Sequence, residues 1–118
     1  KAQDRSPTNE SSANSYLIVN SSGQQRRINF NEILYIESIK DYVNIKTENE
    51  EYIVLETLKT LENQLPSNFV RVHRSFILNS DAILRINGKT VIISSGEEIP
   101  IGETYRKDFF VNLKKKSI

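Results

Sequence analysis

The chain has 118 residues, which fits one domain on the usual range of roughly 100–200 residues per domain. Sixteen Lys and Arg stand against fifteen Asp and Glu, so the formal net charge of +1 gives no global field that would attract a polyanion or a membrane. The sequence lacks cysteine and has one histidine, which excludes disulfide frameworks, thiolate metal sites and thiol nucleophiles.

The N-terminal segment, residues 1–14, is rich in Ser, Asn and Thr and contains no large apolar side chain. Such a segment cannot bury enough apolar surface to offset the entropy lost on ordering it. We therefore expect an interdomain linker over residues 1–14 and a folded domain over residues 15–118. The lack of methionine suggests an excerpt of a longer protein. Without a signal peptide or a long apolar run, we expect a soluble, cytoplasmic product that does not enter a membrane.

Short runs rich in β-branched residues begin after Ser15, and turn residues bound each of them. Asn87-Gly88 predicts a hairpin between two of these runs, and strands joined by tight turns pair antiparallel. The predicted strands cover residues 16–19, 33–36, 42–45, 52–55, 83–86, 91–93 and 99–101.

Two segments show helical spacing instead. Leu58, Leu61 and Leu65 lie on one stripe of the segment 57–65, and Pro66 prevents continuation. Tyr105, Phe109 and Leu113 form a second stripe near the C-terminus. The fold class is therefore mainly β, with two short helices.

The near-neutral total hides a polarised distribution of charge. Residues 48–62 carry a local charge of −4, whereas residues 69–89 and residues 103–118 carry +3 each. Clustered Lys and Arg on one face are the footprint of a protein that binds a phosphate backbone. A chance distribution of solvated surface charge would give the same counts, so charge alone leaves both explanations open.

The segment Phe69-Val-Arg-Val-His-Arg-Ser-Phe-Ile-Leu-Asn79 interleaves apolar residues with more hydrogen-bond donors than a buried strand needs. Here the sequence resembles the LytTR family of bacterial DNA-binding output domains. Two further landmarks carry the resemblance in the same order: Ile33-Leu-Tyr-Ile-Glu-Ser38 followed by Tyr42, and Ile99-Pro-Ile-Gly102 before the last helix.

The resemblance implies a domain of small stacked antiparallel sheets, fused behind a receiver domain in a two-component response regulator of transcription. In that family, loops enter successive major grooves of duplex DNA while neighbouring groups hold phosphates. Family members typically occupy paired direct repeats, so the resemblance also implies a dimer on DNA that receiver phosphorylation promotes. We expect no cofactor and no metal site.

The family's first two reading positions fall on residues 39–44 and on the turn at residue 74. In the first, Lys40 could pair a phosphate, and Tyr42 or Asn44 could reach a base edge. In the second, Arg74 could make the bidentate contact to guanine, which discriminates by roughly 1–3 kcal/mol. Ser75 matches a position suited to a phosphate contact.

The third reading position falls on residues 101–106. Some relatives have a basic residue where this chain has Glu103, and cations one turn further along could replace that charge. A carboxylate there could instead accept from cytosine. The candidate contacts of this segment are Thr104, Tyr105, Arg106 and Lys107.

His73 and Arg71 have structural explanations beside the functional one. His73 could ligate a metal, act as a base, contact DNA or support the turn at Arg74; without cysteine or a second histidine, support or contact is favoured. Arg71 could contact DNA or pair with Glu37 or another carboxylate inside the fold.

Aromatic strand residues usually pack in cores, so we expect Tyr35 and Tyr52 to be core residues. Of the five tyrosines, Tyr42 and Tyr105 remain candidates for DNA contact. The run Lys114–Lys116 is typical of a solvated helix end, and if it touches DNA it would touch phosphates.

No phosphate-loop, dinucleotide or acyl-transfer motif occurs, so we predict that the domain is not an enzyme. Two other classes stay open. A protein-interaction module would take up a peptide at an exposed strand edge, and a small-molecule sensor would need a sizeable apolar pocket.

Overall fold

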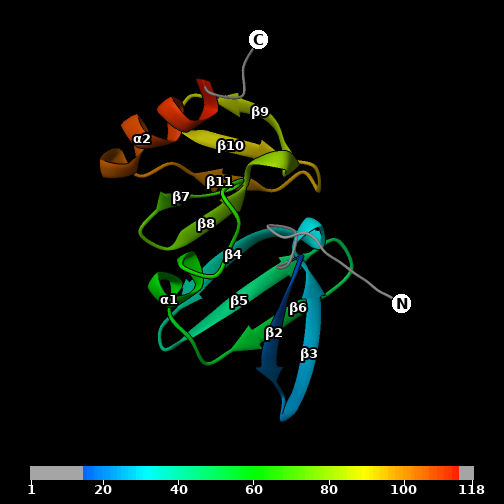
Figure 1. The fold of residues 1–118 in the computed structure, drawn as a ribbon. Coiled ribbons are helices and arrows are strands. Elements are labelled where there is room, and N and C mark those ends of the chain that lie inside the picture. The colour runs from blue at the N-terminus through cyan, green and yellow to red at the C-terminus, as the bar shows by residue number, and fades with distance from the viewer. Residues whose placement is uncertain (1–14, 115–118) are drawn as a thin grey trace.

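A computed structural model describes residues 15–114 of the chain (Figure 1). The predicted linker, residues 1–14, and Lys115 and Lys116 lie outside the described residues. The helices are α1 (Leu58–Glu62) and α2 (Glu103–Lys114), with short 3-10 turns η3 (Phe30–Glu32) and η4 (Ser80–Ala82). The strands are β2 (Tyr16–Ser21), β3 (Gln24–Asn29), β4 (Ile33–Ile39), β5 (Tyr42–Thr47), β6 (Glu51–Val54), β7 (Phe69–His73), β8 (Phe76–Asn79), β9 (Ile83–Asn87), β10 (Thr90–Ile93) and β11 (Glu98–Pro100).

These strands form three antiparallel sheets, which confirms the predicted class of small antiparallel sheets with two short helices. The central sheet has five strands in the order β6-β5-β4-β8-β7, and the hairpin β2-β3 and the sheet β11-β10-β9 are separate. The hairpin predicted at Asn87-Gly88 is present, with Asn87 opposite Thr90 and Gly88 at a φ of 66°.

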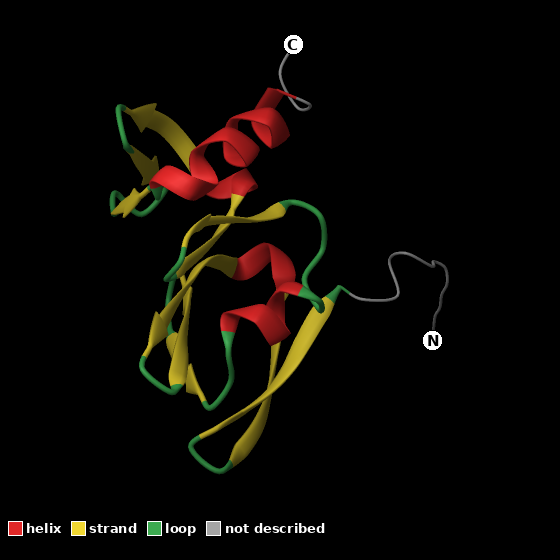
Figure 2. Cartoon of the chain, turned by 90° about the vertical axis from the view of Figure 1, so that its left-hand side faces the viewer, coloured by secondary structure: helices red, strands yellow, loops and turns green. Residues whose placement is uncertain are grey.

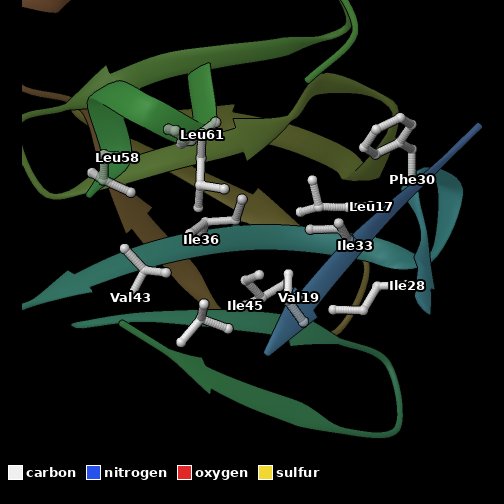
Figure 3. Close-up of a cluster of buried hydrophobic side chains, with 12 residues drawn as sticks. Leu17, Val19, Ile28, Phe30, Ile33, Ile36, Val43, Ile45, Leu58 and Leu61 are labelled. Atoms are coloured by element: carbon white, nitrogen blue, oxygen red, sulfur yellow. The ribbon is translucent and has the colours of Figure 1, made fainter. Parts of the chain in front are cut away.

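The central sheet is buried on both faces because its side chains alternate between two cores. On one face, Ile36 and Ile45 pack with the β2-β3 hairpin and with Leu58 and Leu61 of α1, as Figure 3 shows. On the other face, Tyr35 and Leu78 pack with the third sheet and with Phe109 of α2. Each layer therefore holds the central strands in place from one side.

The tyrosines divide largely as predicted. Tyr35 is buried, and its hydroxyl donates to Glu97 at 2.9 Å; burial, aided by this carboxylate, raises the pKa of Tyr35 well above its usual value. Tyr52 is half-buried against the first core, and its hydroxyl donates to Glu50, a contact that raises its pKa.

Local structure differs from the sequence expectation in three places. The strands β7 and β8 were not among the predicted strands, because the segment 69–79 was singled out for its hydrogen-bond donors. Residues 24–29 form a strand that was not predicted, because five of its six side chains are polar and its first four positions are exposed. The helix expected over residues 57–65 spans only Leu58–Glu62. Thr57 is its N-cap and its hydroxyl accepts from the Thr60 N–H at 3.2 Å.

The sheet order places two turns at the same end of the central sheet. Strands β4 and β7 both pair antiparallel with β8, so they run parallel to each other and finish at the same edge. The β4–β5 turn and the β7–β8 turn therefore lie side by side, on the left in Figure 1. Among the described residues, the helices are all too short or too polar to cross a membrane.

Candidate nucleic-acid interface

Three segments meet at this end of the molecule, and we call them together the turn edge: Lys40 and Asp41, Arg74 and Ser75, and Glu103–Lys107. The backbone connects them. The Ser38 N–H donates to the Ser75 carbonyl at 2.8 Å, and the Gly102 N–H donates to the Val72 carbonyl at 2.7 Å. Figure 2 views the molecule from this side. All three predicted reading segments thus lie along one edge.

The β4–β5 turn projects an exposed cation from a tight two-residue connection. Ile39 pairs with Tyr42 across this turn. Lys40 has a φ of 54°, in the left-handed region that residues other than glycine rarely adopt. Lys40 is exposed, and Tyr42 beside it is 46% exposed. Both therefore face solvent at the tip.

Asn44 has a different environment from its neighbours in the first segment. It lies two residues into β5 and is half-buried, and its amide donates to Glu51 at 2.7 Å. Lys46 donates to the same carboxylate at 3.0 Å, and the two hydrogen bonds lower the pKa of Glu51. Asn44 thus belongs to a polar cluster on the sheet face rather than to the exposed tip.

The β7–β8 turn exposes Arg74 and uses His73 as an internal support. The Ser75 N–H donates to His73 Nδ1 at 3.0 Å, and the His73 ring packs edge-on against Phe76 at 5.7 Å between centroids. Among residues 15–114, the Arg74 side chain makes no hydrogen bond or ion pair and is exposed to solvent. Its guanidinium is therefore available to a ligand.

Arg71 points back into the protein and contacts several elements. Its Nη1 donates to Glu62 of α1 at 3.0 Å, its Nε donates to the His73 carbonyl at 2.9 Å, and its Nη2 donates to the Arg74 carbonyl at 2.7 Å. Its guanidinium also lies 5.6 Å from the centroid of the Tyr105 ring. The ion pair considered for Arg71 is therefore present, but with Glu62 rather than Glu37.

The start of α2 can approach β7 closely because residue 102 is glycine. A Cβ at this position would stand 3.3 Å from the Tyr105 ring and 3.4 Å from the His73 ring, which leaves little room for a side chain. Steric crowding at residue 102 thus explains why the landmark Ile99-Pro-Ile-Gly102 ends in glycine. Tyr105 is half-buried and faces Arg71, whereas Thr104 and Lys107 are exposed.

Two charged groups on α2 have protein partners of limited strength. Glu103 lies 3.6 Å from Lys89, and both side chains are more than 70% exposed. Such a pair contributes little to stability. The Arg106 guanidinium lies 5.8 Å from the Phe110 ring centroid. Both charges can therefore respond to a ligand at the helix start.

The opposite end of the central sheet is acidic. Because β5 runs antiparallel to β4, the turn of residues 48–50 lies at the far end from Lys40. Glu48 and Glu50 are exposed there, and Glu50 lies 3.5 Å from Arg26 of the β2-β3 hairpin. Of the acidic segment noted in the sequence, residues 48–50 thus lie opposite the turn edge, whereas Glu62 lies near it and pairs with Arg71.

An edge of exposed turns that carries Lys40, Arg74 and Lys107, opposite an acidic end, is typical of a β-rich domain that binds a polyanion. The comparisons agree with this class. Residues 23–114 match the model of the LytTr DNA-binding domain. The chain therefore belongs to the LytTr DNA-binding domain family, which is a DNA-binding family rather than an enzymatic one.

Curated proteins and a solved structure show the same relationship. The chain is 37% identical over 83 residues to the sensory transduction protein LytT of Bacillus subtilis, a match that covers 65% of this chain and 34% of that protein. It is 31% identical over 83 residues to the transcriptional regulatory protein LytR of Staphylococcus aureus, with the same coverage. A solved LytTr DNA-binding domain from Bacillus cereus superposes with a TM-score of 0.75 at 25% identity, covering 84% of this chain and 96% of that one.

The chain spans about a third of the length of the curated relatives it matches. The match covers the strands and turns that build the turn edge. The family assignment therefore concerns the DNA-binding domain.

Proposed function

We propose that this domain binds duplex DNA sequence-specifically through the turn edge, with the two turns and the start of α2 entering the major groove. The observation that carries the proposal is the exposed Arg74 guanidinium, which no group among residues 15–114 engages. An arginine in the major groove can donate two hydrogen bonds to guanine, the commonest contact by which proteins select a base.

The other candidate residues on and beside the turn edge take roles that follow from their exposure and their contacts. Lys40 and Lys107 are exposed cations that would neutralise phosphates on either side of Arg74, with Ser75 as a further phosphate contact. Tyr42, Thr104 and Arg106 are the remaining candidates for contacts to the groove. Asn44 and His73, which have partners inside the protein, would act as supports of the tips.

We further propose that the domain is the output part of a two-component response regulator. Curated relatives named as sensory transduction and transcriptional regulatory proteins are about three times as long as the matched part, which supports a further domain such as a receiver. Two copies would occupy paired direct repeats, and phosphorylation of the receiver would promote the pair. Such a regulator would act in the cytoplasm.

Peptide capture at a strand edge is less well supported, because both edges of the central sheet are partly engaged. On β7, the Val72 carbonyl already accepts from the Gly102 N–H at 2.7 Å. On β6, the Ile53 carbonyl accepts from the Ser21 hydroxyl at 3.1 Å. A peptide strand would have to displace these contacts.

The proposal is tested with Arg74→Ala. A duplex selected from a random pool by the unsubstituted domain and a random duplex of the same length serve as probes. Loss of the base contact is expected to weaken binding to the selected duplex by about 1–3 kcal/mol while binding to the random duplex changes little. Affinities measured by fluorescence anisotropy at several salt concentrations give both quantities. Equal losses on both duplexes would contradict a base-reading role.

A further inference from the structure

Arg71 is the most heavily engaged cation among the described residues, and its contacts converge on the turn that carries Arg74. It donates to the carbonyls of both His73 and Arg74 and to Glu62, and it stacks near Tyr105. Its side chain is 21% exposed. With three of its five N–H groups donated to protein acceptors and its side chain mostly buried, Arg71 has little capacity left for a phosphate or a base.

We infer that Arg71 is a positioning residue for DNA recognition, which fixes the backbone of the β7–β8 turn so that Arg74 is held outward. Glu62 and Tyr105 in turn hold the Arg71 guanidinium. We call this set, Glu62, Arg71, Tyr105 and the carbonyls of His73 and Arg74, the Arg71 brace. The inference rests on the proposed function, because it assigns Arg71 an effect that acts through Arg74.

The geometry requires arginine in particular. The planar guanidinium presents several N–H groups in a fixed fork, so one side chain can bind two successive carbonyls and a carboxylate together. A lysine ammonium keeps the charge but cannot reach all three acceptors with the same geometry. Arg71→Lys therefore separates the two roles: a contact with phosphate survives the change, whereas the brace does not.

The brace also joins elements that are separate in the chain. Glu62 lies on α1 and Tyr105 on α2, and the turn between β7 and β8 lies between them. The guanidinium near the Tyr105 ring adds a cation–π contact. The start of α2, which forms the third segment of the turn edge, is thereby held at a fixed place relative to Arg74.

The experiment is a double-mutant cycle on the whole 118-residue chain, with the selected and random duplexes as probes. Arg71→Lys is expected to lower the ratio of selected to random affinity about tenfold, which is about 1.4 kcal/mol. The slope of log affinity against log salt stays unchanged because lysine retains the positive charge. In the Arg74→Ala background, Arg71→Lys is expected to lower this ratio no further.

Arg27→Lys is the matched control, because Arg27 also lies over a tyrosine ring, 5.1 Å from the Tyr16 centroid, on the β2-β3 hairpin. It should leave the affinity ratio unchanged. Urea unfolding of each variant checks that the fold is retained. If Arg71→Lys does not fold stably, Glu62→Gln removes one anchor of the brace and should lower the same ratio.

Two results would overturn the inference. An affinity ratio that Arg71→Lys leaves intact would mean that a positive charge is sufficient at this position, as it is for a phosphate contact. Independent, additive losses in the cycle would show that Arg71 does not act through Arg74. If Arg74→Ala alone leaves the affinity ratio unchanged, the proposed base-reading role itself is wrong, which is a different failure.

Discussion

At the scale of single residues, Lys40 holds a backbone conformation that is unfavourable for its side chain. Its φ of 54° lies in the left-handed region, which costs a residue other than glycine roughly 1–2 kcal/mol. Strained residues of this kind are frequent at functional sites, where the side chain is needed despite the strain. In the proposed interface, Lys40 supplies a cation at the tip of the β4–β5 turn.

Lys40→Gly is therefore expected to stabilise the fold and weaken DNA binding. Relief of strain, less the entropy that glycine gains in the unfolded chain, should raise the free energy of unfolding by about 0.5–1 kcal/mol. Affinity for selected and random duplexes should fall together, with a salt slope lower by about one. Urea unfolding and anisotropy titrations measure the two effects.

Ser22→Gly is the control, since Ser22 has the same φ of 54° in the β2–β3 turn and carries no charge. It should give a similar gain in stability and leave the salt slope unchanged. If Lys40→Gly binds DNA as tightly as the unsubstituted domain at every salt concentration, Lys40 does not contact DNA.

The sequence predicted a supporting role for His73, which its contact with the Ser75 N–H agrees with, but it could not identify the partner of Arg71. Arg74 stands out because it lies in a segment with more donors than a buried strand needs. The Glu62–Arg71 pair depends on how α1 docks against the sheet, which local spacing does not encode. Asn44 likewise looked like a tip residue, but in the structure it lies opposite Ile53 in the sheet and its amide donates to Glu51.

At the scale of elements, α2 combines a buried side with a charged, exposed start. Phe109 is fully buried in the second core, whereas Lys107 is exposed two residues earlier. The apolar side fixes the helix against β7, and Gly102 permits the close approach. Cations near the start of α2 therefore stand at a defined place on the turn edge.

Lys107→Ala tests this element. Because a lysine that contacts phosphate carries no sequence information, binding to selected and random duplexes should weaken alike, and the salt slope should fall by about one. Arg27→Ala, on the β2-β3 hairpin, is the control that removes one positive charge elsewhere. A change confined to the selected duplex would instead assign Lys107 to base contact.

The sequence predicted α2 and most of the strands, whereas β3, β7 and β8 were not predicted as strands. The stripe of Tyr105, Phe109 and Leu113 predicts the position of α2, which spans Glu103–Lys114. The strand β3 was missed because Ile28 is its one buried residue. This polar segment forms a strand because it pairs with β2, which its own composition does not indicate.

At the scale of the whole molecule, the two ends of the central sheet differ in charge. The turn edge with its cations and the acidic turn of residues 48–50 lie at opposite ends of the central sheet. A polyanion is attracted to one end and repelled by the other, so the orientation on DNA follows from the field as well as from contacts. The net charge of +1 conceals this arrangement, and the strand order reveals it.

The most direct test of the central claim is a map of backbone amide chemical shifts on adding the selected duplex. The account predicts the largest changes at residues 40–42, 74–75 and 103–107, with little change at residues 48–50. Largest changes at residues 48–50 or on the β2-β3 hairpin, with the turn edge unaffected, would contradict it.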